Sequence, residues 1–190
     1  MKITLSSEPI DDLTHENLAL GFFSDERPPR GYCGHADWRL NGLISKLIAK
    51  GTITGSSMER VLIHTNYRIP PPKIFLFGLG KSTHLDYEKL YHTGYDVSQT
   101  LSEMRCDDFA LDIPGAGRCT LEVSKMAKSL LSGLWDYFTD HPEKRGILSS
   151  CILGEEVFID EITLGIHEFK VDGKKGTAVE IHQGKEHRHV

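Results

Sequence analysis

The sequence lacks the features that would place it in a membrane or in a disulfide-stabilised secreted class. No apolar run comes near the length of about 20 residues that crosses a bilayer. The opening stretch, MKITLSSEPIDD, turns polar and acidic early, so we expect no signal peptide. The four cysteines, Cys33, Cys106, Cys119 and Cys151, form no C-x-x-C pair. We therefore expect free thiols in a reducing cytoplasm.

Motifs for metal chemistry and for nucleophilic catalysis are also missing. The ten histidines include no H-E-x-x-H pair, and no spacing supplies the four ligands of a structural zinc site. No G-x-S-x-G motif occurs. The net charge of -5 gives no general attraction to nucleic acid or to an anionic membrane. We expect no catalytic residue, no metal, no cofactor, no membrane and no nucleic-acid partner.

The composition that is present suits a folded globular chain. Hydrophobic residues make up 39% of the 190 positions and charged residues 26%, values typical of globular domains. A chain of this length can bury a substantial core without disulfides or metals. One compact domain with modest extensions is therefore the expected organisation.

Strand-like runs alternate with helical patterns from the N-terminus to about residue 140. Short apolar runs rich in branched and aromatic residues predict strands at 1–5, 17–23, 60–65, 73–78 and 107–115. Apolar residues at helical spacing predict a helix at 35–51, a long helix from Leu90 to Met104, and a helix at 120–138. This alternation predicts an α/β layered fold with ligands bound beyond the carboxyl ends of the strands.

The last forty residues show a different pattern from the alternation that precedes them. EEVFIDEITLGIHEFKV, DGKKG and TAVEIHQ are interpreted as strand, turn and strand, followed by the polar tail GKEHRHV. We therefore expect a domain at residues 1–150 and a C-terminal β-hairpin extension with a polar tail at 151–190. An exposed edge of this hairpin is a candidate contact for self-association.

The loop GLGKS follows the strand KIFLFG and raises the question of phosphate binding. It ends like a P-loop, but Phe75 stands where that motif needs its first glycine. Thr83 stands where the dinucleotide fingerprint needs its third glycine. A sharp turn out of the strand is the favoured use of these glycines, with phosphate contact as the alternative. The candidate ligand contacts in this loop are Gly78, Gly80 and Lys81.

A second glycine loop, IPGAGRCT, is the stronger candidate for anion binding. Gly115 and Gly117 allow backbone N–H groups to turn toward one point, and Arg118 adds a charged fork that suits phosphate. The helix that follows contributes the positive end of its dipole. A flexible strand-to-helix connection with the arginine in solvent remains the alternative.

The order of these segments resembles a known domain. ADWRLNGLISKLIAKGTITGSSME, RVLIHT, KIFLFGLGK and a long helix resemble the amino-terminal domain of the leucyl aminopeptidase family, peptidase family M17. The turn at 51–56 and the strand exit at 77–81 correspond to the family's G-x-F-x-G-K turn and V-G-L-G-K exit. DDFALDIPG and AKSLLSGLWDYF resemble its last strand and helix. The resemblance covers roughly residues 1–140.

This resemblance implies a three-layer, macro-domain-like fold with a mixed, mainly parallel sheet. It does not imply peptidase chemistry, because the family's two-metal catalytic domain, with its N-T-D-A-E-G-R stretch, has no counterpart in this sequence. By analogy with macro domains, which bind ADP-ribose, DIPGAGR occupies the diphosphate loop. LALGFFSDE occupies the N-A-A-N segment, but only Asn17 precedes it, so ADP-ribosyl hydrolysis is not expected.

Two functional hypotheses follow from these observations. The first is a stand-alone, non-catalytic relative of the aminopeptidase domain that acts as a binding, assembly or regulatory module in the cytoplasm. Its ligand would be small and anionic or nucleotide-like, held by Gly115, Gly117 and Arg118, and its partner a second copy or an aminopeptidase. The alternative is a macro-domain-type protein that binds or hydrolyses ADP-ribose or a nucleotide phosphate.

Overall fold

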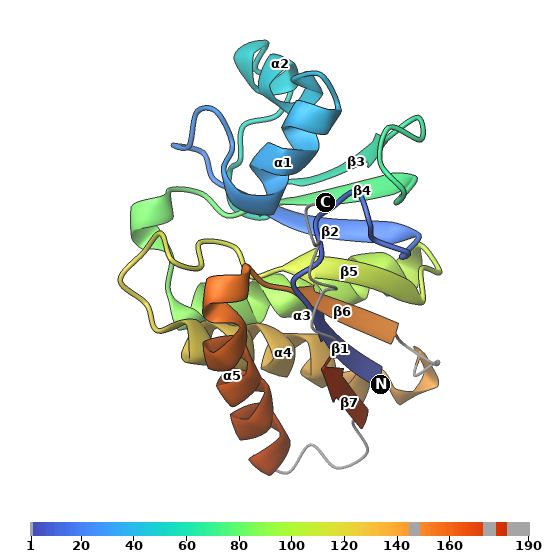
Figure 1. Cartoon of the computed structure of the whole chain (residues 1–190), viewed down its shortest axis with the longest axis vertical. Coiled ribbons are helices and arrows are strands. Elements are labelled where there is room, and N and C mark those ends of the chain that lie inside the picture. Colours follow the sequence, from blue (N-terminus) through green and yellow to red (C-terminus); the bar gives the residue numbers. More distant parts are fainter. Residues whose placement is uncertain (1, 145–148, 173–177, 182–190) are drawn as a thin grey trace, which may run out of the picture.

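The apolar runs of the sequence form one seven-stranded sheet in the computed structural model, which describes residues 2–144, 149–172 and 178–181 (Figure 1). The strand order is β3-β4-β2-β5-β6-β1-β7, and β3 runs antiparallel to β4 while the other pairs are parallel. The strands are β1 (Lys2–Ser6), β2 (Asn17–Phe22), β3 (Arg60–His64), β4 (Lys73–Gly78), β5 (Asp108–Asp112), β6 (Ser149–Leu153) and β7 (Ala178–Ile181).

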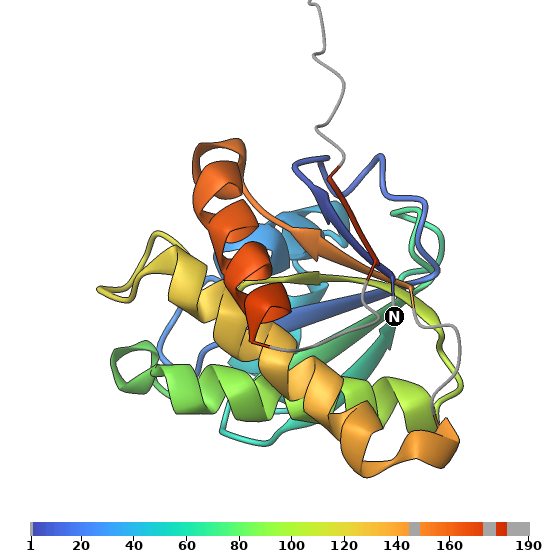
Figure 2. The ribbon, with the colours of Figure 1, turned by 90° about the horizontal axis from the view of Figure 1, so that it is seen from below.

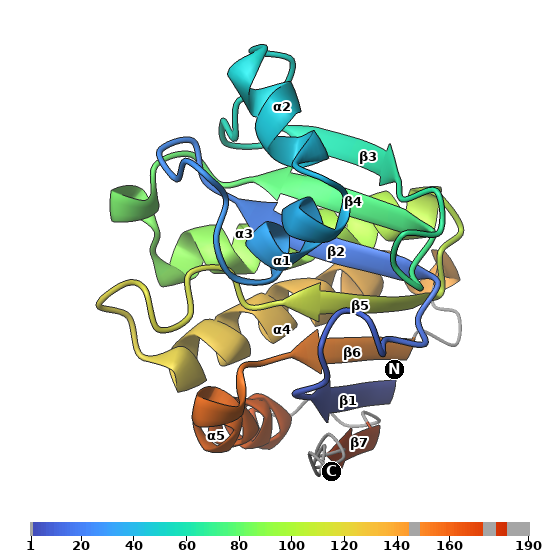
Figure 3. The same ribbon diagram turned by 45° about the horizontal axis from the view of Figure 1, so that its top comes forward.

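Helices cover both faces of this sheet (Figure 3). Two short helices pack on one face: α1 (Gly31–Arg39) and α2 (Leu43–Ala49). Three longer helices pack on the other: α3 (Tyr87–Glu103), α4 (Val123–Asp140) and α5 (Ile159–Val171). Short 3₁₀ helices lie at Ser82–His84, Pro142–Lys144 and Glu156–Phe158. The predicted three-layer α/β fold with a mixed, mainly parallel sheet is confirmed.

The alternation of side chains along the central strand β2 divides the core into two layers. Leu18, Leu20 and Phe22 pack toward α1 and α2, whereas Ala19 packs toward α3 and α4. All four are buried, as expected for a parallel strand covered on both faces. The parallel strands all end at the same edge of the sheet, where the arrowheads of β4, β5 and β6 point in Figure 3. The loops that follow them meet at this carboxyl edge.

The predicted single helix at 35–51 is wrong, because the chain forms two helices there. Asn41 and Gly42 both have positive φ, 58° and 69°, and such residues cannot continue a right-handed helix. The buried Asp37 carboxylate accepts a hydrogen bond from the Ser45 N–H at 3.0 Å and stabilises the start of α2. Gly51 does follow α2 with φ of 69°, as a C-terminal cap requires.

The predicted C-terminal β-hairpin is also wrong. Its first strand is the helix α5, whose buried Ile159, Ile162, Ile166 and Phe169 recur at helical spacing. Burial of this face against α4 outweighs the strand preference of the β-branched residues. Its second strand, β7, does exist, but it pairs in parallel with β1, so α5 is a crossover and not part of a hairpin. The hairpin edge considered for self-association is therefore absent.

Strand β6 was missed by the sequence analysis. It lies between β5 and β1 and pairs with both, so the expected domain boundary between residues 150 and 151 falls inside the sheet. The segment that follows this boundary contributes β6, α5 and β7 to the same layers. Most of the predicted turn and all of the polar tail at 184–190 lie outside the described residues.

Helix α4 lies between α3 and α5 (Figure 2) and contacts both closely through backbone atoms. A methyl group on Gly133 of α4 would overlap the carbonyl oxygen of Tyr91 on α3, and one on Gly94 would overlap the carbonyl oxygen of Leu130. Gly165 of α5 meets the carbonyl oxygen of Ser124 in the same way. These glycines bring the three helices closer together than side chains would allow.

We expect Gly133→Ala to destabilise the fold. Alanine is the better helix former by about 1 kcal/mol, but its methyl group has to displace a backbone carbonyl of α3, and overpacking of this kind costs about 2–3 kcal/mol. Urea unfolding should show a net loss of about 1–2 kcal/mol in the free energy of unfolding. Ser132→Ala, next to it in the same helix, is the control. A more stable Gly133→Ala variant would contradict the close contact.

Candidate functional site

The β5–α4 loop, residues 113–122, lies at the carboxyl edge and contains the stronger predicted glycine motif. Gly115 and Gly117 have φ of 84° and 68°, a region that favours glycine. The N–H groups of Ala116 and Arg118 donate to the carbonyls of Ile113 and Gly115 inside the loop. Within the described part of the chain, the N–H groups of Gly115 and Gly117 have no acceptor. Gly117 is exposed and its amide is open to a ligand, whereas Gly115 is buried.

Arg118 does not extend into solvent but pairs with Glu26. Its Nη1 lies 2.8 Å from both carboxylate oxygens of Glu26, and the two side chains are only 23% and 15% exposed. Glu26 belongs to the loop between β2 and α1. The ion pair therefore joins two loops of the carboxyl edge and fixes the guanidinium beside Gly31.

A small cavity of about 20 Å³ lies beside this ion pair. Tyr32, Asp112, Arg118, Glu155 and Phe158 are among the residues that line it. The space is enough for about one water molecule. The Phe158 ring packs directly over Gly117, so any larger ligand has to displace this ring.

Asp112 is a buried ionisable group in this cavity. It ends β5, is almost fully buried, and accepts a hydrogen bond from the N–H of Gly21 at 3.2 Å. Burial raises the pKa of this carboxyl to about 7, against the opposing effects of the Gly21 N–H and the Arg118 charge. A buried carboxyl with a pKa near neutrality in a cavity is a typical functional-site candidate. In the sequence, the feature that could have identified Asp112 is that an acidic residue directly follows the apolar run FAL.

The backbone amides of the first glycine loop, GLGKS, are occupied by a neighbouring loop. The N–H of Gly78 donates to the carbonyl of Glu59 at 2.8 Å, and that of Gly80 to the carbonyl of Gly55 at 2.7 Å. Both amides are therefore used to hold the neighbouring loop and form no phosphate cradle, while Lys81 is exposed. The interpretation of GLGKS as a turn agrees with these contacts.

The six candidate ligand contacts therefore do not converge on one site. Arg118 faces Glu26 and Gly31, and Gly117 lies under the Phe158 ring. Gly78 and Gly80 instead contact residues 55–59. The Leu85 side chain reaches Gly115 from the α3 side. The two glycine loops are thus neighbours with different surroundings.

Residues 54–56 form an anion nest that the chain fills with its own Glu59. The N–H groups of Thr54, Gly55 and Ser56 donate to the Glu59 carboxylate at 2.7–3.1 Å, as does the Thr54 hydroxyl at 2.8 Å. Partial burial raises the pKa of Glu59, but these hydrogen bonds outweigh it and lower the pKa overall. The role of this carboxylate was not predicted from the sequence.

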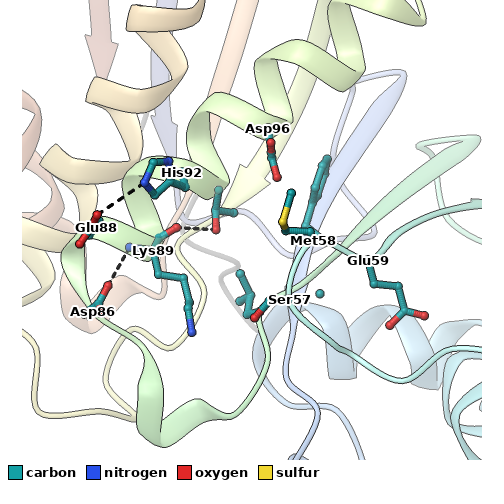
Figure 4. A pocket seen from close by; sticks show the side chains of 12 residues that line it. Ser57, Met58, Glu59, Asp86, Glu88, Lys89, His92 and Asp96 are labelled. Atoms are coloured by element: carbon teal, nitrogen blue, oxygen red, sulfur yellow. Dashed lines mark hydrogen bonds and ion pairs between the residues drawn. The ribbon is translucent and has the colours of Figure 1, made fainter.

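A larger cavity lies between α3 and the loop at 57–59 (Figure 4). Its volume is about 460 Å³, within the range of small-molecule sites, roughly 300–1,000 Å³. Figure 4 shows Ser57 and Met58 on the loop and His92 and Asp96 on α3. Phe77, Gly78 and Leu79 at the end of β4 also line it. We call this space the α3 cavity.

The described residues contain neither a candidate metal site nor a candidate membrane span. There, no three side chains of His, Cys, Asp or Glu come together in a way that could hold a metal ion. Across the same residues, no helix combines the length and the apolar character needed to span a bilayer.

We expect Glu59→Gln to lower the free energy of unfolding at pH 7 by about 1–2 kcal/mol, because the amide is a weaker acceptor for the nest. The folded pKa of Glu59 lies below its unfolded value of 4.5. Its contribution is therefore complete above pH 4.5 and is lost as the pH falls through the folded pKa. Urea unfolding should show a difference in the free energy of unfolding between wild type and variant that becomes smaller in acid. Exposed Glu88→Gln is the control. A difference that does not change with pH would contradict the role of the Glu59 carboxylate in the nest.

Asp112→Asn should change stability with the opposite pH dependence. The folded pKa of about 7 lies above the unfolded value of 3.8, so wild-type stability falls as the pH rises between these values. Asparagine retains the acceptor for the Gly21 N–H without the buried charge. We expect the melting temperature of the variant to rise relative to wild type from pH 5 to pH 8. Exposed Asp107→Asn should show no such trend, and a pH-independent difference would refute buried ionisation.

Comparison with known proteins identifies the domain type. Residues 19–139 match the family model described as the cytosol aminopeptidase family, N-terminal domain. A probable cytosol aminopeptidase of Geobacter sp. (strain M21) is 29% identical over 138 residues, which cover 72% of this chain and 28% of the relative. One from Alkaliphilus oremlandii (strain OhILAs) is 24% identical over 172 residues, 85% and 34% of the two chains. The chain spans about a third of these relatives or less.

Solved structures of macrodomains and of a leucine aminopeptidase share the fold. A mutant of the Oceanobacillus iheyensis macrodomain aligns with a TM-score of 0.66 and 11% identity, over 88% of this chain and 92% of that one. The Trypanosoma brucei macrodomain in complex with ADP-ribose aligns with a TM-score of 0.66 and 14% identity, over 90% and 69%. A tomato leucine aminopeptidase mutant aligns with a TM-score of 0.61 and 19% identity, over 90% and 36%.

At these identities the structural likeness shows the fold alone. The family rests on the sequence match, which covers β2 through α4 and with them both glycine loops and the α3 cavity. The resemblance inferred from GLGK and its neighbouring segments is thereby confirmed. This chain belongs to the cytosol aminopeptidase family, as its macrodomain-like N-terminal domain.

Proposed function

We propose that this chain is a binding module that takes a small phosphate-bearing ligand at the β5–α4 loop. One observation carries the proposal: the N–H groups of Gly115 and Gly117 lack acceptors among the described residues, in the same loop that carries Arg118. Backbone amides and an arginine fork together suit a phosphate. The loop also leads into α4, whose N-terminal dipole favours negative charge.

The nucleotide class of the ligand is proposed from the fold neighbours. The Trypanosoma brucei macrodomain has been solved in complex with ADP and with ADP-ribose. Those ligands carry a diphosphate, the group that the β5–α4 loop suits in this chain. ADP-ribose is therefore the first ligand to test.

In this proposal Glu26 occupies the anion site until the ligand arrives. Its carboxylate presents two oxygens to Arg118, as a phosphate would. A bound phosphate would replace this carboxylate, and the Phe158 ring would move away from Gly117 to admit it. The cavity of about 20 Å³ is then the closed form of the site.

We propose binding, and not peptide hydrolysis, as the activity of this chain. The match to the family is to its N-terminal domain, and the chain spans 28% and 34% of two aminopeptidase relatives. We further propose that it acts in the cytoplasm, in keeping with the cytosolic designation of these relatives. An aminopeptidase or a second copy of the chain is the proposed protein partner.

Calorimetric titration with ADP-ribose tests this function. We expect saturable binding that Arg118→Gln weakens about tenfold, the effect of losing one charge-assisted contact. Glu26→Gln should tighten binding, because it removes the competing carboxylate. Arg105→Gln, an exposed arginine at the far end of α3, is the control for charge.

Two results would contradict the proposal. One is the absence of both heat and thermal shift with ADP-ribose in the wild type and in Glu26→Gln, because that variant removes the internal competitor. The other is hydrolysis of leucine p-nitroanilide by the purified chain with added divalent metal, because a binding module has no such activity.

A further inference from the structure

The α3 cavity is built from an apolar base and a charged rim. Phe77 and Leu79 at the end of β4 are buried, and Met58 on the opposite loop is 76% exposed. The exposed lining is mostly apolar. A pocket with an apolar base and a few polar groups at its rim is the usual form of a small-molecule site.

The rim is predominantly negative. It carries four carboxyl groups, from Glu59, Asp86, Glu88 and Asp96, against the ammonium of Lys89 and the imidazole of His92. The Lys89 ammonium donates to the carbonyl of His84 at 3.1 Å. The charge that complements this rim is positive.

Asp96 is the carboxylate best placed to receive a cation. Its Oδ1 accepts from Nη2 of Arg60 at 2.9 Å, while its Oδ2 has no hydrogen bond within the described part of the chain. Figure 4 shows the Asp96 side chain on α3, at the end of the cavity near Met58. Asp86 caps α3 through Oδ1, and Glu59 fills the nest at 54–56, so both have structural tasks.

We propose that the α3 cavity binds a small organic cation, with a primary ammonium group at Asp96 and an apolar body over Phe77, Leu79 and Met58. This site is separate from the phosphate site and does not rest on it. The two sites select ligands of opposite charge. In this proposal the β4–α3 connection, whose amides hold no phosphate, takes part in ligand binding through its residues that line the α3 cavity.

A charge series of three similar compounds tests the proposal on the wild-type chain. The probes are 2-phenylethylamine, 2-phenylethanol and 3-phenylpropionate, followed by amide chemical shifts in nitrogen-15 spectra. We expect saturable shifts from the amine, confined to residues 57–59, 77–79 and 92–96, with an affinity in the range of about millimolar for so small a ligand. The alcohol should bind about fivefold more weakly, and the carboxylate should not bind.

Asp96→Asn is expected to bring the affinity for the amine down to that for the alcohol. Glu103→Gln removes a carboxylate from the C-terminal end of α3, outside the cavity lining, and should leave the affinity for the amine unchanged. Equal binding of amine and alcohol by the wild type would overturn the proposal. Undiminished amine binding by Asp96→Asn would also overturn it. The absence of chemical-shift changes with all three probes would do the same, and would indicate that the cavity binds a larger partner.

Discussion

The direct contact between the backbones of α3 and α4 is the constraint on which the rest of the structure depends. The Tyr91 carbonyl occupies the space that a side chain at position 133 would need, and Gly94 admits Leu130 in the same way. Helices this close cannot be separated or rotated independently. Because the β4–α3 and β5–α4 connections end in these helices, these two glycine contacts set the spacing of both glycine loops and of the cavities beside them.

The carboxyl edge that results is held by internal ion pairs and hydrogen bonds. Arg118 is paired with Glu26, and the nest at 54–56 is filled by Glu59. Each pair joins groups that would otherwise attract ions from solvent. Any anion that binds at this edge therefore has to compete with a carboxylate of the chain itself.

The sequence predicts the fold where burial leaves a simple pattern. The strands at 17–23 and 73–78 are apolar on both faces because helices cover both sides of the sheet. Such runs can be recognised in the sequence without knowing which strands pair with them. The helix α5 was misread because Ile159 and Ile162 favour strands, and only packing on α4 decides their conformation. The pairing of Arg118 with Glu26, 92 positions apart, and the raised pKa of Asp112 arise from the tertiary fold, so no local pattern could predict them.

The position of β1 determines when the sheet can be completed as the chain is synthesised. In chain order β1 is the first strand of the described sheet, yet its two neighbours are β6 and β7, the last two of the described strands. Until they appear, Ile3 and Leu5, which are fully buried in the finished sheet, have no strand beside them. Closure of the sheet is therefore a late, long-range event, and a nascent chain halted before residue 149 would keep an apolar strand open to chaperones.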